Sequence, residues 1–209
     1  MKNRMVADLF SRVQPPVILN SALLTVLFCC ITFGCAFVPE QEQLVSGKID
    51  EPLTRSNGNC TETDSALNDQ RKIPAPLPEL GPDSIAILDW NIYKGQRAGW
   101  ESDLLRLGRG KDILLLQEAA LNEDLQELLQ QNNLYWNLNS GFRYRGVETG
   151  VLLASAVRPL GSCGMRYDEP VIGLPKTILI NRYGITDSSD ELLVATVHGI
   201  NITLGIGAY

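Results

Sequence analysis

Length, composition and charge limit this chain to one folded domain with an appendage. Its 209 residues are 44% hydrophobic, which is enough to bury one substantial core. The formal net charge of −6 argues against a protein held to nucleic acid by many phosphate contacts, because such proteins carry a basic face. A metal enzyme is not excluded, since a bound divalent cation can supply local positive charge.

An apolar segment lies near the N-terminus. Residues 17–38 carry no charge and are long enough to cross a bilayer, which takes about 20 residues. Basic residues before the segment and acidic residues after it predict a cytoplasmic N-terminus and an extracytoplasmic domain. The length favours an uncleaved anchor, whereas Cys35 after a glycine favours a lipoprotein signal. A buried core helix, or a misassigned start codon with a cytoplasmic product, is the remaining alternative.

Residues 39–82 are polar, lack aromatic side chains and end in a series of prolines, which predicts a disordered linker. All three tryptophans and all six tyrosines lie beyond residue 82, so the folded domain is predicted to span residues 83–209. No CxxC pair occurs, and no zinc site is predicted. Cys60 and Cys163 could pair if the domain is extracytoplasmic, although Cys60 lies within the predicted linker.

Short apolar runs alternate with helical stretches and then dominate the domain. Helices are predicted over residues 100–107 and from Asn122, a good N-cap residue. The run 84–90 is nearly continuous in apolar residues, which suits a strand covered on both faces. This order predicts an α/β sandwich of two packed, mainly antiparallel sheets flanked by helices. The predicted strands are 84–90, 112–117, 134–138, 150–155, 177–181, 192–198 and 200–204.

Two polar residues stand at the ends of the first two predicted strands. Asn91 directly follows residues 84–90, and Glu118 directly follows residues 112–117. Taken singly, Asn91 is typical of a turn cap and Glu118 of a loop acid. If the strands are neighbours, however, the amide and the carboxylate end side by side at one edge of the sheet. Such oxygen ligands suit Mg²⁺, which keeps several waters around it.

Four motifs occur in the order and spacing of the endonuclease–exonuclease–phosphatase superfamily, which the domain therefore resembles over residues 83–209. That superfamily includes exonuclease III, the deoxyribonucleases and the neutral sphingomyelinases. The LPK and VHGINITLG stretches (174–176 and 197–205) look similar to an uncharacterised bacterial branch of it. The four motifs are WNIYKG (90–95), LLLQEA (114–119), GVLLAS (150–155) and LLVATVHGIN (192–201).

The resemblance implies a role for three residues. Glu118 corresponds to the metal ligand, and Asn91 to the catalytic asparagine that helps hold the metal and the phosphate. His198 corresponds to a strand-end histidine near the scissile phosphate, with a hydrogen-bonded structural histidine as the alternative. Independently, Arg143 and Arg145 in the predicted loop 141–150 are candidate substrate contacts, because guanidinium groups match phosphate oxygens. A solvated charged loop is the alternative for these arginines.

The expected function is a phosphodiester hydrolase that uses Mg²⁺ or Mn²⁺. Nucleic acid, phospholipid and inositol phosphate are all substrates within the superfamily. Its later GD-N and SDH motifs do not occur before Tyr209, so the second half of the fold and a positioned base, worth about 10²–10⁴-fold in rate, are missing. The chain as given is therefore expected to be truncated and inactive. A membrane-tethered binding module without catalysis and a lipoprotein acting through surface contacts are the alternatives.

Overall fold

The computed structural model describes residues 36–40, 43–60, 79–168 and 175–199. The predicted strand 200–204 and nearly all of the apolar segment 17–38 lie outside these ranges. Within them, no helix combines the length and the apolar composition that spanning a bilayer requires. The elements are β1 (Ala36–Phe37), β2 (Gln43–Lys48), β3 (Glu51–Ser56), β4 (Ile87–Asn91), the 3₁₀ turn η3 (Tyr93–Gly95), α3 (Trp100–Gly108), β5 (Ile113–Ala120), α4 (Glu123–Gln131), β6 (Tyr135–Tyr144), β7 (Val147–Ser155), β8 (Gly161–Tyr167), β9 (Lys176–Gly184) and β10 (Glu191–Val197).

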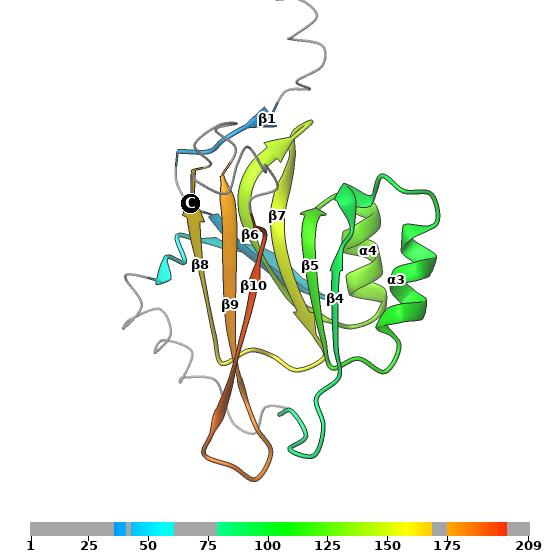
Figure 1. Ribbon diagram of the computed structural model, residues 1–209, viewed down its shortest axis with the longest axis vertical. Coiled ribbons are helices and arrows are strands. Elements are labelled where there is room, and N and C mark those ends of the chain that lie inside the picture. The colour runs from blue at the N-terminus through cyan, green and yellow to red at the C-terminus, as the bar shows by residue number, and fades with distance from the viewer. Residues whose placement is uncertain (1–35, 41–42, 61–78, 169–174, 200–209) are drawn as a thin grey trace, which may run out of the picture. The chain divides into compact units, whose positions relative to one another are not determined.

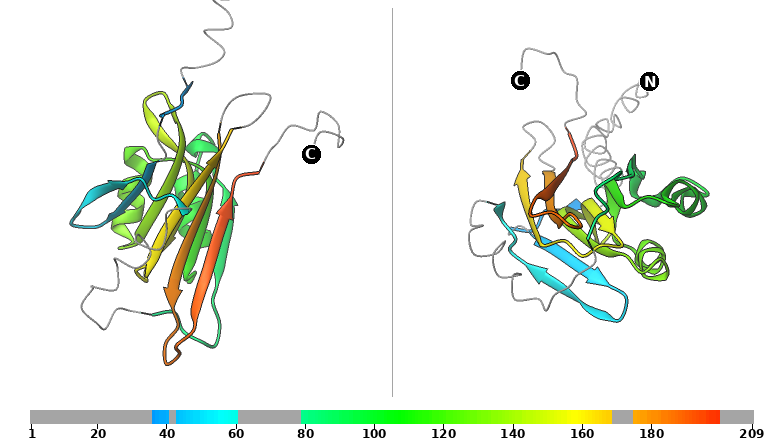
Figure 2. Two further views of the ribbon diagram at one scale, coloured as in Figure 1. Left: turned by 90° about the vertical axis from the view of Figure 1, so that its left-hand side faces the viewer. Right: turned by 90° about the horizontal axis from the view of Figure 1, so that it is seen from below.

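Two sheets and two helices form three layers, which confirms the predicted sandwich. The seven-stranded sheet has the order β3-β2-β6-β7-β5-β4, with β1 also paired to β6. The three-stranded sheet has the order β10-β9-β8. Among the named strands of the described ranges, every pairing is antiparallel except that of β4 with β5. Helices α3 and α4 cover one face of the large sheet and the small sheet covers the other (Figures 1 and 2).

Alternate side chains of the central strands point to opposite faces of the large sheet and belong to two separate hydrophobic cores. On the helical side, Leu116 of β5 packs with Leu125 and Leu129 of α4. On the other side, Ile113 of β5 packs with Leu179 of β9. Strand β5 is therefore buried on both faces, as its run of apolar residues requires.

Strand β4 is covered on its helical face only, which corrects the prediction for residues 84–90. Leu88 and Trp90 pack against the helical core, whereas Ile87 on the opposite face is 44% exposed. The cause lies in the second sheet, which ends at β10 over β5 and β7. The inner face of β4 consequently stays open to solvent at the edge of the large sheet.

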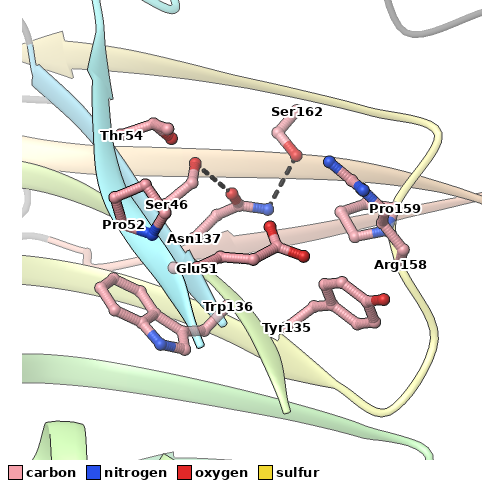
Figure 3. Close-up of a pocket in the computed structure, with 11 residues that line it drawn as sticks. Ser46, Glu51, Pro52, Thr54, Tyr135, Trp136, Asn137, Arg158, Pro159 and Ser162 are labelled. Carbon is pink, nitrogen blue, oxygen red and sulfur yellow. Dashed lines mark hydrogen bonds between the residues drawn. The ribbon is translucent and has the colours of Figure 1, made fainter. Parts of the chain in front are cut away.

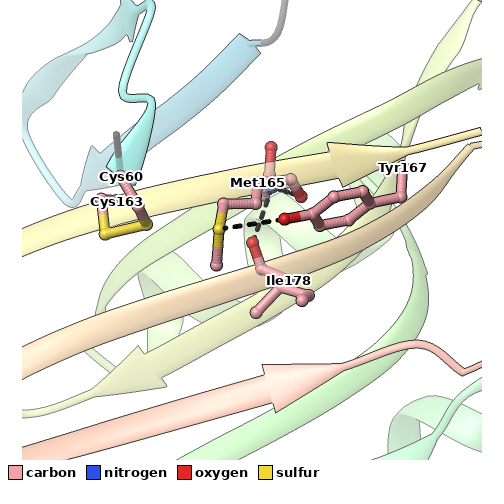
Figure 4. The surroundings of a disulfide bond; sticks show 6 residues. Cys60, Cys163, Met165, Tyr167 and Ile178 are labelled. Atoms are coloured by element: carbon pink, nitrogen blue, oxygen red, sulfur yellow. Dashed lines mark hydrogen bonds between the residues drawn. A yellow bond between two sulfur atoms is a disulfide. The ribbon is translucent and has the colours of Figure 1, made fainter. Parts of the chain in front are cut away.

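The prediction of a linker over residues 39–82 is wrong for its first part, because β2 and β3 form a hairpin within the large sheet. Val45 of β2 is fully buried and lies opposite Leu138 of β6. A disulfide between Cys60 and Cys163 ties the segment after β3 to β8 (Figure 4). The compact unit accordingly begins at Ala36 and not at residue 83.

The predicted loop 141–150 is instead the β6–β7 hairpin. Its turn consists of Arg145 and Gly146, both with positive φ (51° and 82°), as a two-residue hairpin turn with the handedness of the sheet twist requires. Strand β8 was not predicted, because its GSCGMRY sequence lacks the β-branched residues that mark strands. The helix prediction at Asn122 is confirmed, since the Asn122 side chain accepts a hydrogen bond from the Leu125 amide at 3.0 Å.

Candidate functional site

The candidate site lies where β4 and β5 end at the same edge of the large sheet. These strands are parallel neighbours, with Asn91 opposite Gln117 in the register. The sequence predicted this adjacency, and the structure confirms it. The carboxyl ends of parallel strands meet at one rim, so polar residues near those ends lie close together.

Glu118 reaches the rim through a bulge in β5. The pairing of β5 with β7 shifts register between Leu116 and Ala119, and Glu118 within the shift has a φ of 49°. Bulges re-aim side chains, and left-handed backbone at a residue with a β-carbon costs about 1–3 kcal/mol. The surrounding sheet therefore holds Glu118 in a conformation that it would not adopt by itself.

Three side chains surround the Glu118 carboxylate, whose side chain is only 12% exposed. The Asn91 amide nitrogen donates to Oε1 at 3.1 Å, and the Lys94 ammonium forms an ion pair with Oε2. His198, which directly follows β10, brings Nε2 to 3.5 Å from Oε1. The rim thus joins residues from both sheets and from the turn after β4.

The turn η3 fixes the position of Lys94 and the orientation of Asn91. Tyr93, Lys94 and Gly95 all have positive φ (50°, 59° and 68°), so the chain reverses sharply after β4. The Tyr93 amide donates to the Asn91 carboxamide oxygen at 2.9 Å. That bond turns the Asn91 NH₂ group toward Glu118, and Asn91 acts here as a hydrogen-bond donor to the carboxylate.

The environment lowers the pKa of Glu118. Burial alone raises this pKa, but hydrogen bonds from Lys94 and Asn91, together with the charges of Lys94 and His198, outweigh that effect. The carboxyl is therefore ionised at neutral pH, as a metal ligand or an electrostatic partner must be.

A second row of polar groups lies one residue before Glu118 on β5 and two residues before Asn91 and His198 on the adjacent strands. Gln117 donates from Nε2 to Asp89 at 2.6 Å and to the Thr196 hydroxyl at 3.0 Å. This row links β4, β5 and β10 directly beneath Glu118. These hydrogen bonds fix the positions of the ends of β4, β5 and β10 relative to one another.

Glu118 is the carboxylate at the rim through which a divalent cation such as Mg²⁺ could be held. No group of three or more His, Cys, Asp or Glu side chains converges within the described ranges, as a closed zinc or calcium cage would need. Mg²⁺ requires fewer protein ligands than such a cage provides, since it is usually bound through one or two carboxylates and keeps several waters. The Lys94 ammonium already places a positive charge against this carboxylate, and a metal ion would compete with it.

The structure does not bring the two predicted arginines to this carboxylate. Arg143 forms an ion pair with the buried Glu148 at 3.3 Å. Arg145 is exposed in the β6–β7 turn, with its guanidinium 5.3 Å from the ring of Tyr144. Among the contacts of the described residues, none joins either arginine to Glu118.

Sequence reasoning missed Lys94 and Asp89 as members of the site. Lys94 sits three residues after Asn91 in a turn, where charged residues are common and carry no signal. Asp89 lies two residues before Asn91 in β4, and because side chains two residues apart in a strand point to the same side, both lie on the same face. This alternation was the one sign in the sequence that could have identified Asp89.

Comparisons with known proteins give relatives without a stated activity. They are named UPF0294 proteins. The chain is 31% identical over 180 residues to that of Vibrio campbellii, which covers 86% of this chain and 59% of the relative. It is 32% identical to that of Klebsiella pneumoniae (65% of this chain, 51% of the relative) and 35% identical to that of Vibrio parahaemolyticus (59% and 43%). The chain thus spans about half the length of the curated relatives that it matches.

These comparisons overturn the predicted superfamily membership. No family model matches the chain, and no solved structure matches it. The relatives carry the UPF0294 name, which differs from the predicted family. The resemblance to the endonuclease–exonuclease–phosphatase superfamily, which rested on four short motifs, was therefore wrong as an assignment. The geometry at Glu118 stands independently of it.

Proposed function

We propose that the rim around Glu118 hydrolyses a phosphodiester with the help of a bound Mg²⁺ or Mn²⁺. One observation carries the proposal: a carboxylate, an amide, an ammonium and an imidazole meet at the end of two parallel strands. A partly buried anion of this kind, with a perturbed pKa and groups able to bind phosphate beside it, is typical of a catalytic site.

Each side chain has a role that its contacts support. Glu118 would hold the cation through its carboxylate, and Asn91 keeps that carboxylate oriented by donating to Oε1. Lys94 moves from the carboxylate to a phosphate oxygen when the cation binds. His198, which contacts Oε1 of the carboxylate whereas Lys94 contacts Oε2, exchanges a proton with the attacking water or the leaving alcohol.

A Mg²⁺ or Mn²⁺ held by Glu118 would supply positive charge to polarise the phosphoryl oxygen and stabilise the leaving oxyanion. The hydrolysis forms one bond from the water oxygen to phosphorus and breaks the bond from phosphorus to the alcohol oxygen. The proton lost by the water passes to His198 and ends on the alcohol.

Among nucleic acid, phospholipid and inositol phosphate, a phospholipid-type substrate has the most support. The net charge of −6 disfavours a long polyanion. The outer face of the small sheet, next to His198, exposes apolar side chains: Leu193 is 68% exposed and Val197 53%. Val197 lies opposite Ile178 in the register, so this apolar face continues onto β9. Lipid tails or a membrane surface would suit such a face.

We also propose that the domain works outside the cytoplasm, at the cell envelope. The Cys60–Cys163 disulfide supports this placement, because such bonds persist in oxidising compartments and are rare in the cytosol. A membrane anchor or lipoprotein signal within residues 1–38 would agree with it, and both stay predictions.

A second candidate function is a binding module without catalysis. The observation that favours it is the saturation of Glu118, whose two oxygens already contact Asn91, His198 and Lys94. Such a cluster also serves to fasten β10 and the turn after β4 to β5. In that case the rim binds no divalent cation with useful affinity.

The test combines calorimetric titration of Mg²⁺ into this chain with hydrolysis of bis(p-nitrophenyl) phosphate by a form of the protein extended to the length of the curated relatives, since the chain as given is expected to be inactive. We expect Mg²⁺-dependent hydrolysis that Glu118→Gln lowers by about 10²-fold or more and His198→Gln by about 10²–10⁴-fold. Glu127→Gln, an exposed acid on α4, is the matched control and should leave both readouts unchanged. Undiminished hydrolysis in Glu118→Gln would remove the proposed mechanism. If Mg²⁺ binds but no hydrolysis follows, or if Mg²⁺ does not bind and no hydrolysis occurs, the binding module without catalysis is the remaining function.

A further inference from the structure

A separate pocket opens on the other side of the large sheet from the helices. It has a volume of about 130 Å³ and lies between the β2–β3 hairpin, the start of β6 and the β7–β8 connection (Figure 3). None of the residues that surround Glu118 lines it. Any ligand of this pocket is therefore independent of the proposed hydrolysis.

Two opposite charges face this pocket from different segments. Glu51 of β3 and Arg158 of the β7–β8 connection extend their charged groups into the same space (Figure 3). Neither side chain forms an ion pair or hydrogen bond with another residue in the part of the chain that the structure describes. The Arg158 guanidinium lies 5.8 Å from the centroid of the Tyr135 ring, which restrains it over the mouth of the pocket.

The floor of the pocket is a buried network with a fixed orientation. Asn137, only 5% exposed, accepts a hydrogen bond from Ser46 at 2.6 Å and donates to the Ser162 hydroxyl at 2.8 Å. It also donates to Asn181 at 3.3 Å, which donates in turn to the Tyr183 hydroxyl at 3.0 Å. Because Ser162 accepts from Asn137, its own hydroxyl proton is directed elsewhere and can be donated to a ligand.

From these contacts we infer that the pocket binds a small zwitterion of the α-amino acid class. The ligand carboxylate pairs with Arg158 and accepts from the Ser162 hydroxyl, while the ligand ammonium pairs with Glu51. A simple anion would be repelled by Glu51, and a simple cation by Arg158, so only a ligand that carries both charges satisfies both groups. The pocket volume of about 130 Å³ leaves room for a compact amino acid such as glycine, alanine or serine.

Calorimetric titration of the chain with alanine tests this inference. Trp136 lines the pocket and is 2% exposed, so its fluorescence gives a second readout that Trp136→Phe should abolish. We expect alanine to bind, and acetate and methylammonium, which each carry one half of the charge pattern, to bind at least tenfold more weakly. Each of Glu51→Gln and Arg158→Gln should weaken alanine binding by tenfold or more.

Matched controls separate this site from the rest of the molecule. Glu127→Gln on α4 and Arg109→Gln after α3 remove exposed charges that do not line the pocket, and both should keep the affinity for alanine. Glu118→Gln should also keep it, since the two sites share no residue. The inference is overturned if no amino acid binds at millimolar concentration, if acetate binds as tightly as alanine, or if both pocket variants bind undiminished.

Discussion

The disulfide offers a prediction whose magnitude follows from the chain length that it closes. Cys60 and Cys163 are separated by 103 residues, so their bond removes a long loop from the unfolded ensemble. In the chain-entropy treatment, closing a loop of this length stabilises the folded state by about 4.7 kcal/mol at 25 °C. Domains of this size are stable by about 5–15 kcal/mol in total. The double change Cys60→Ser and Cys163→Ser should therefore remove a large part of the stability, about 2–5 kcal/mol in practice.

Guanidinium unfolding of the oxidised protein, the reduced protein and the double variant measures this loss. The reduced protein and the double variant should agree, because both lack only the covalent link. The slope of free energy against denaturant should rise in both, since the unlinked chain exposes more surface. A loss below about 1 kcal/mol in the double variant, or no linked peptide on non-reducing digestion, would refute the reasoning.

Three further predictions concern the rim and the sheet. Lys94→Met should tighten Mg²⁺ binding by about tenfold, because the ammonium that competes for the Glu118 carboxylate is gone; weaker binding in calorimetry would contradict the assigned role. The lowered pKa of Glu118 contributes stability that is present above its ordinary value of 4.5 and is lost as the pH falls through the folded value. The unfolding free energy of the parent should thus fall more steeply below about pH 4.5 than that of Glu118→Gln, and identical profiles would exclude the effect. Gly150→Ala should destabilise the fold by about 3 kcal/mol, since the added β-carbon would lie 1.9 Å from the Asn139 carbonyl oxygen. Thermal unfolding checks this against Gly81→Ala, which meets no atom within 4 Å and should be nearly neutral.

The candidate site was predictable from sequence to the extent that local pattern determines where strands end. Apolar runs followed by Asn91 and Glu118 placed both residues near strand ends, and the parallel pairing of β4 with β5 then brought them together. Strand β5 nevertheless continues past Glu118, through a bulge, to Ala120. The orientation of the site was not predictable. It depends on the bulge at Glu118 and on the left-handed turn that carries Lys94, and backbone strain of this kind is imposed by surrounding packing rather than by local preference.

The amino-acid sequence by itself determined where the helices and the central strands lie along the chain, because hydrophobic periodicity and capping residues act over a few positions. Only the tertiary structure decided the fate of residues 43–56, which have a linker's composition but form strands. Their stability comes from pairing with β6, about 90 residues away, through contacts such as Val45 opposite Leu138, and from a disulfide whose cysteines are 103 residues apart. Such long-range contacts produce no periodic pattern in a local stretch of sequence, so the composition of this polar segment does not predict its strands.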